Sequence, residues 1–212
     1  MQDDSLLIYV HDPMCSWCWG FRPAFAKLCD ALPSNIRLRR LLGGLAPDAD
    51  QPMPLEMQTR LQDTWRRIEQ RVPGTRFNFD FWQLCAPRRS TWRACRAVIA
   101  ARTIDPACEG AMIHAIQRAY YLQARNPSDT DTLVAIAQQL GLDTERFAAA
   151  LDADSTQQLL DAEMAMARQL GADSFPSLRL QIAGSVWPIA VAYTNAEAML
   201  ESITQLTGTP EG

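Results

Sequence analysis

Residues 5–18 read SLLIYVHDPMCSWC. The first half is a compact apolar run that Asp12-Pro13 ends, which predicts a short buried strand over residues 5–11. The second half opens a helix predicted over residues 15–32, because apolar side chains recur there at helical spacing: Phe21, Phe25, Leu28 and Leu32. A second strand is predicted over Ile36–Leu42, which Gly43-Gly44 ends. The chain therefore begins with a β-α-β unit whose helix starts at a pair of cysteines.

The rest of the chain is predicted as a helical block followed by a return to strands. Apolar side chains recur at helical intervals through the middle, where Ser155 and Gln158 have the spacing of a capping box. Strands are predicted over residues 178–182 and, as a return strand, over 186–187 and 189–193, with a last helix capped by Asn195. The order β-α-β, helices, β-β-α predicts an α/β sheet assembled from both ends of the chain. Its domain comprises residues 1–44 and 172–212, and residues 45–171 form an inserted helical domain.

Composition narrows the class of protein. The chain has 212 residues, of which 48% are hydrophobic and 21% charged, so it can bury a globular core. The net charge of −4 argues against a nucleic-acid binder, and no apolar run is long enough to cross a bilayer. The acidic N-terminus and five-residue apolar stretch do not resemble a secretory signal, so a cytoplasmic location is expected. In a reducing compartment, cysteines are expected to be catalytic, metal-binding or buried thiols.

The spacing of Cys15-Ser16-Trp17-Cys18 favours redox chemistry. Residues three apart lie on one face of a helix, so the two sulfurs can approach bonding distance. A helix N-terminus offers unpaired N–H groups and partial positive charge, which favour the nucleophilic thiolate. We expect Cys15 to attack and Cys18, deeper along the helix, to resolve the mixed disulfide.

Other readings of these residue types stay open. The pair can be half of a zinc site, although no second close pair exists and His11 and His114 lack metal-ligand spacing, so no metal is expected. It can also be a coincidence within a helix. Cys29 is too far along the helix to exchange with the pair, and three further cysteines are expected to be buried small apolar residues: Cys85, Cys95 and Cys108. Nine arginines between residues 60 and 96 are expected on solvated helix faces, or else to attract an acidic substrate such as glutathione.

These features resemble the DsbA-like thioredoxin superfamily, and most of all its predicted protein-disulfide-isomerase (FrnE-like) branch. The likeness rests on the Cys15–Cys18 pair, Pro23 eight residues after Cys15, the helical insert with segments 92–97 and 119–121, and the sequence SFPSL at residues 174–178. It implies a thioredoxin fold with a large all-helical insertion. It also implies that Pro176 follows a cis bond and faces the dithiol, so that the backbone of Phe175 can pair with an extended peptide or glutathione. An ordinary proline at the start of a strand is the alternative.

The sequence also departs from relatives. The dipeptide Ser16-Trp17 lacks the histidine or proline of several thioredoxin-fold proteins, and Tyr9 stands where thioredoxins carry a buried aspartate. Neither a strongly oxidising poise nor the thioredoxin proton relay is therefore expected. Trp17 can form an aromatic wall for substrate, whereas Trp19 is expected in the core. Asp12 is expected to be a turn or cap residue rather than a proton acceptor.

The sequence thus predicts a thiol–disulfide oxidoreductase acting on protein thiols or small thiols, with glutathione as a possible partner and no required cofactor. An alternative is a glutathione-dependent isomerase or transferase of the kappa-class and 2-hydroxychromene-2-carboxylate isomerase type, which this architecture also resembles. Those proteins place a serine where Cys15 stands. A further alternative is a zinc-bound or peptide-binding scaffold without catalysis.

Overall fold

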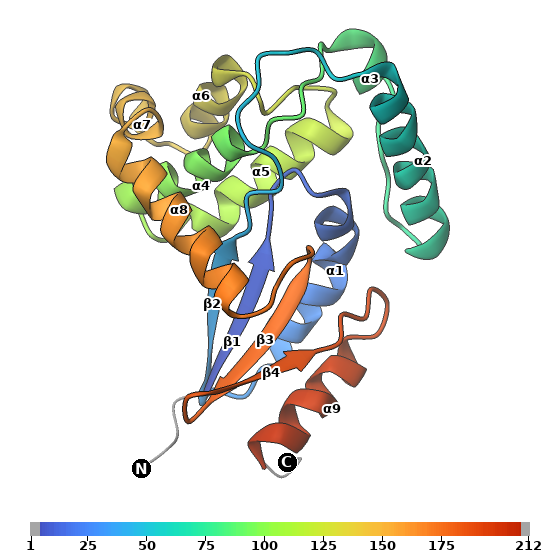
Figure 1. The fold of residues 1–212 in the computed structure, drawn as a ribbon, viewed down its shortest axis with the longest axis vertical. Coiled ribbons are helices and arrows are strands. Elements are labelled where there is room, and N and C mark those ends of the chain that lie inside the picture. The colour runs from blue at the N-terminus through green and yellow to red at the C-terminus, as the bar shows by residue number, and fades with distance from the viewer. Residues whose placement is uncertain (1–4, 209–212) are drawn as a thin grey trace.

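A four-stranded mixed sheet forms the centre of the computed structural model, which describes residues 5–208. The strands are β1 (Ser5–His11), β2 (Ile36–Leu42), β3 (Ser177–Ile182) and β4 (Ser185–Ile189), in the spatial order β2-β1-β3-β4. β1 pairs in parallel with β2, and the β1–β3 and β3–β4 pairs are antiparallel. Both ends of the chain therefore contribute to one sheet (Figure 1), as predicted.

Helices cover both faces of this sheet. α1 (Ser16–Ala31) contains Pro23 and packs with α9 (Ala196–Thr207) on one face, through a cluster that includes Leu7, Phe21 and Met199. α8 (Asp154–Gln169) contacts β2, and its Ala167 packs with side chains of the opposite face. The alternating side chains of β1 explain this arrangement, since Leu7 and Tyr9 lie in one cluster while Ile8 and Val10 lie in the other.

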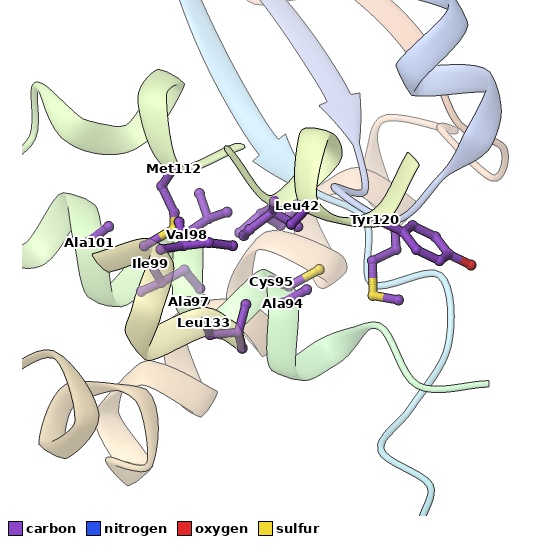
Figure 2. Close-up of a cluster of buried hydrophobic side chains, with 14 of the residues drawn as sticks. Leu42, Ala94, Cys95, Ala97, Val98, Ile99, Ala101, Met112, Tyr120 and Leu133 are labelled. Carbon is purple, nitrogen blue, oxygen red and sulfur yellow. The ribbon is translucent and has the colours of Figure 1, made fainter. Parts of the chain in front are cut away.

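The remaining helices gather at the end of the sheet where β1 ends, which Figure 1 shows. They are α2 (Leu55–Arg71), α3 (Phe81–Leu84), α4 (Trp92–Ile104), α5 (Cys108–Leu122), α6 (Thr130–Gln139) and α7 (Thr144–Leu151). α4 is buried along most of its length and contacts α5, α6, α7 and α8. Its Cys95 and Val98 lie in a cluster with Met112 of α5 and Leu133 of α6 (Figure 2). The insert therefore has its own hydrophobic core.

That core also reaches the sheet domain. Leu42 of β2 and Met14, which follows β1, belong to the same cluster as the insert helices. α8 contacts both α4 and β2. The division into residues 1–44 with 172–212 and 45–171 stays a prediction, and its outermost residues, 1–4 and 209–212, lie outside the described part.

Three local predictions are wrong. α8 begins at Asp154 with Ala153 at its N-cap, so Ser155 lies inside the helix and forms no capping box. The return strand is a single element that ends at Ile189, so residues 190–193 are not strand. The four-residue helix α3 was not predicted, because four residues are too few to show a helical period.

Candidate active site

Cys15 and Cys18 lie at the start of α1. The backbone N–H of Cys15 donates to the Asp12 carbonyl at 3.0 Å, and the Cys15 carbonyl accepts from the N–H of Trp19 at 3.1 Å. Cys15 itself is extended (φ −80°, ψ 116°), so the chain turns from the end of β1 directly into the helix. Both sulfurs belong to free thiols, with Cys15 6% exposed and Cys18 fully buried. The predicted helix therefore begins at the predicted pair.

The loop before β3 brings Phe175 to the first cysteine. The Phe175–Pro176 peptide bond is cis, as the resemblance implies, and the Cys15 thiol donates to the Phe175 carbonyl at 3.4 Å. The Phe175 ring lies against the backbone of Gly43, where an added Cβ would fall 2.1 Å from the ring. Gly43 therefore has to lack a side chain for Phe175 to occupy this position.

A cavity of about 350 Å³ opens beside Cys15, and we call it the front cavity. Trp17 of α1 and Cys15, at the N-cap of α1, line one side of it, and Phe175 lines it from the loop before β3. The insert contributes residues 88–91 to the same lining. Trp17 is half-buried, and its ring meets the edge of Tyr193 at a centroid distance of 5.1 Å. Three of the five predicted site residues therefore face one space. Pro176 is buried, and neither Pro176 nor Cys18 is part of this lining.

Cys18 lies in different surroundings. Burial, together with a hydrogen bond to Cys15 and the charge of that sulfur, raises the pKa of the Cys18 thiol well above its usual range. A hydrogen bond from the Asp12 backbone partly opposes this. Tyr9 lines the same cavity as Cys18, and burial, both sulfurs and a hydrogen bond with Cys18 raise the pKa of Tyr9. Cys18 is therefore a protonated thiol at neutral pH unless a reaction removes its proton.

The buried Asp12 carboxylate accepts several hydrogen bonds next to the cysteine motif. One carboxylate oxygen accepts from the N–H of Met14 at 2.7 Å, which makes it the predicted turn residue. The other accepts from the Leu45 N–H at 2.8 Å and the Thr91 hydroxyl at 2.6 Å, and from the Cys95 thiol at 3.5 Å. Burial raises the pKa of Asp12, and these hydrogen bonds oppose the rise. Asp12 therefore fastens the motif to the insert.

Two aromatic contacts fix the first turn of α1 against the insert. The indole N–H of the buried Trp65 donates to the Ser16 hydroxyl at 2.9 Å. The Trp19 ring stacks on Tyr121 at 5.7 Å, and its N–H donates to the Arg76 carbonyl. Trp19 is half-buried and packs against the insert core, which agrees with its predicted packing role.

The other cysteines differ from one another. Cys95 is buried as predicted, but it donates to Asp12 rather than packing only among apolar atoms. The prediction that Cys85 and Cys108 are buried is wrong, since both are only half-buried, with Cys85 donating to the Ala124 carbonyl at 3.0 Å. They lie at the ends of helices, where solvent reaches them. Residues 5–208 contain no group of three or more Cys, His, Asp or Glu side chains arranged to hold a metal ion.

Some arginines of the segment 60–96 form ion pairs within the fold, whereas the sequence predicted solvated helix faces. Arg96 is only 7% exposed and pairs with Asp48, and Arg88 pairs with Asp129 beside the front cavity. Arg89 lines the same cavity and makes no ion pair to a described residue. The solvated-face prediction therefore fits Arg66, which is exposed and pairs with Asp63, but not Arg96.

Sequence reasoning missed the roles of Thr91, Arg89 and Tyr9. Thr91 is 79 residues from Asp12, and no local period connects them. The only sequence signal for Arg89 is its place in a basic segment just before α4. Tyr9 was noticed as a departure from relatives, but its position beside Cys18 depends on how α1 packs on β1.

A dithiol at a helix start, facing a cis-proline loop in a thioredoxin fold with a helical insertion, defines a DsbA-like protein. Comparison agrees, because a family model described as thioredoxin (Thioredoxin_5) matches residues 8–181. This covers most of the chain, so the chain belongs to that family.

Solved structures and curated proteins give more specific likenesses. A candidate protein disulfide isomerase from Nitrosomonas europaea is 26% identical, with a TM-score of 0.84 over 98% of this chain and 100% of that one. The cytosolic disulfide reductase DsbM from Pseudomonas aeruginosa, also solved with GSH, is 26% identical, with a TM-score of 0.76 over 95% of this chain and 98% of that one.

Among curated proteins, the ClpXP adapter protein SpxH of Halalkalibacterium halodurans is 26% identical over 78% of this chain. The match covers 55% of that relative, so the chain spans little more than half its length. None of the helices in the described part is both long and apolar enough to span a membrane.

Proposed function

We propose that this protein is a thiol–disulfide oxidoreductase that exchanges disulfides through Cys15 and Cys18. The observation that carries the proposal is the position of Cys15: its sulfur lies at the front cavity, against the Phe175 carbonyl, with Cys18 buried directly behind it. This asymmetry suits an attacking sulfur that meets substrate and a resolving sulfur that does not.

The chemistry needs only these two sulfurs. In the reducing direction, the Cys15 thiolate attacks a substrate disulfide R–S–S–R′, forms Cys15–S–S–R and releases R′–S⁻. The Cys18 thiolate then attacks Cys15, which forms the Cys15–Cys18 disulfide and releases R–S⁻. The oxidising direction is the reverse. No cofactor takes part, and an external thiol such as glutathione returns the disulfide to the dithiol.

The substrate side is built for a chain carrying a negative group. Trp17 gives an aromatic wall, the segment around Phe175 and Pro176 gives backbone groups for an extended peptide, and Arg89 gives a cation in the lining. Glutathione has both a peptide backbone and carboxylates, and the DsbM relative has been solved with GSH. We therefore propose protein thiols or glutathione as partners and, by likeness to the cytosolic DsbM, a cytoplasmic location.

A trapping experiment tests this function. Cys18→Ala should accumulate mixed disulfides, because Cys15 still attacks and nothing resolves the product. Mass spectrometry should find glutathione or substrate peptide on Cys15 after incubation with oxidised glutathione or insulin. Cys108→Ala, at a cysteine that lines neither the front cavity nor the surroundings of Cys18, is the matched control and should behave as wild type. Full insulin-reductase activity in Cys18→Ala would overturn the assignment.

A binding role without catalysis is the second candidate, favoured by relatives that are named ClpXP adapter proteins. A Cys15→Ala/Cys18→Ala variant separates the two, since an adapter keeps its partner binding without the dithiol. The glutathione-transferase alternative predicts that Cys15→Ser retains glutathione conjugation, and the zinc-scaffold alternative predicts stoichiometric zinc in purified protein.

A further inference from the structure

A second cavity lies behind the dithiol. It has a volume of about 440 Å³, and we call it the rear cavity. Its lining includes Cys18, Tyr9 of β1, Arg22 of α1, Arg40 of β2, and His114 and Gln117 of α5. The two sulfurs thus adjoin different spaces: Cys15 lines the front cavity and Cys18 the rear one.

The rear cavity is polar enough to hold water. Gln117 is only 3% exposed, and it lines the cavity from α5 with its polar amide side chain. Arg22 contacts the His114 ring at 3.2 Å and has no acidic partner within residues 5–208. Arg22 and His114 are half-buried, and polar groups that line a cavity in this way normally hydrogen-bond to ordered water.

Resolution of a mixed disulfide requires that the Cys18 thiol lose its proton. This thiol is fully buried, and only its thiolate form can attack. At that moment substrate is attached to Cys15 and fills the front cavity. The proton then has to leave by a route that substrate does not cover.

We propose that the rear cavity is the proton-release site of the resolving step and that Tyr9 is a catalytic residue within it. The Cys18 S–H bond breaks and its proton passes to water in the rear cavity. The sulfur keeps the electron pair, and the Tyr9 hydroxyl donates a hydrogen bond to this thiolate. Cys18 then attacks Cys15, the Cys15–Cys18 bond forms, and the substrate leaves as a thiolate. This inference rests on the proposed function and assigns one of its steps to this chain's own residues.

Tyr9 suits the role of donor rather than base. Burial and the neighbouring sulfurs raise its pKa, so its hydroxyl keeps its proton at neutral pH. Its ring is held by a tilted contact with Phe25, at a centroid distance of 4.0 Å, and by stacking on His11, at 4.8 Å. Other titratable and charged groups also face Cys18 or line the rear cavity: Cys15, Asp12, Tyr121, Tyr193, Arg22, Cys29, Asp30, Arg40 and His114.

Two-step kinetics test the inference. Reduced protein is mixed with the chromogenic disulfide dithiobis-nitrobenzoate, which releases one coloured thiol when Cys15 attacks and another when Cys18 resolves. The first phase scales with reagent concentration and the second does not. Cys18→Ala identifies the first phase, and Cys15→Ala gives the background from the other thiols.

Tyr9→Phe keeps the ring and its stacking but removes the donor. We expect the second phase to slow about tenfold and its pH dependence to move about one unit higher, with the first phase unchanged. An unchanged second phase, or equal slowing of both phases, would overturn the role of Tyr9. Absence of the first phase in the wild type would instead overturn the proposed function, and this inference with it.

A plug at the rear cavity tests the route independently. Ala111→Trp places an indole in its lining, and Ala107→Trp places one at the exposed N-cap of α5, which is not part of the lining. We expect Ala111→Trp alone to slow the second phase several-fold. If both variants resolve at the wild-type rate, proton release through the rear cavity is wrong.

Discussion

The two cysteines lie one helical turn apart but line different cavities. Cys15 meets the front cavity, formed jointly by the motif, the insert and the loop before β3. Cys18 meets the rear cavity, formed by β1, β2, α1 and α5. The difference follows from the helix itself, because the N-cap sulfur projects from the end of α1 while the sulfur in its first turn packs toward β1. Under the proposed function, this arrangement gives the motif one sulfur for substrate and one shielded from it.

Removing either sulfur tests this difference between the cysteines and should have the largest effect on activity. Cys15→Ala should lower insulin-reductase and glutathione-exchange rates roughly 1,000-fold, because no other thiol lines the front cavity at the cis-proline loop. Cys18→Ala should keep the first exchange at a wild-type rate and lose turnover. Equal losses of the first exchange in both variants would mean that the two sulfurs are not distinct.

Asp12 joins the cysteine motif to the insert, so its removal should lower the stability of the fold. Asp12→Ala leaves the Met14 and Leu45 N–H groups without their acceptor and the Thr91 hydroxyl with only the Ala46 carbonyl, at a cost of about 3 kcal/mol in the free energy of unfolding. Urea denaturation measures it. Asp131→Ala, at an exposed position on α6, should change stability by less than about 0.5 kcal/mol. A similar small change for Asp12→Ala would contradict its role as the fastening point.

His11 lies next to the rear cavity, because its ring stacks on Tyr9, and its pKa gives a test of how closely this region is packed. It is buried, neither of its ring nitrogens has a hydrogen-bond partner within residues 5–208, and burial with the charges of Arg40 and Arg102 lowers its pKa to about 3. The unfolded chain therefore binds a proton below about pH 6.5 that the folded protein does not, so stability falls as pH falls from 6.5 toward 3.

Replacing this ring should reduce acid sensitivity. Between pH 6 and 5, His11→Phe should lose less stability than wild type, by up to roughly 1.4 kcal/mol per pH unit. Urea denaturation at both pH values gives the difference. His114→Phe, at a half-buried ring, should alter the slope less. Identical slopes in His11→Phe and wild type would show that His11 is not held neutral.

Replacing Arg89 tests substrate binding at the front cavity, and we expect the smallest effect of these predictions. Arg89→Gln should raise the KM for glutathione about threefold to fivefold and weaken its dependence on salt, because one cation near the substrate is lost. Arg66→Gln, whose exposed cation pairs with Asp63 away from the cavity, should leave KM unchanged. Equal salt dependence in wild type and Arg89→Gln would exclude a charge contact.

Local patterns predicted much of the fold. Strands β1 and β2 agree with the predicted ranges because alternating and compact apolar runs report directly on burial. α1 agrees because its apolar spacing and following proline are local. The predicted capping box at Ser155 is wrong because such a pattern also occurs inside a helix that starts earlier, here at Asp154.

The site was only partly predictable, for a physical reason. The Cys15–Cys18 pair lies within one helical turn, so spacing alone identifies it. The contact of Cys15 with Phe175 spans 160 residues and was expected only through family resemblance. The Asp12–Thr91 bond and the rear cavity depend on how separate elements pack, which no periodicity encodes.

Redox titration of the wild-type protein tests the central claim most directly. The protein is equilibrated at a series of reduced-to-oxidised glutathione ratios, its free thiols are alkylated, and its peptides are mapped by mass spectrometry. We predict one two-electron transition in which only Cys15 and Cys18 become protected, joined to each other. Free thiols at both positions under every ratio, or protection that begins at Cys29 or Cys85, would contradict it.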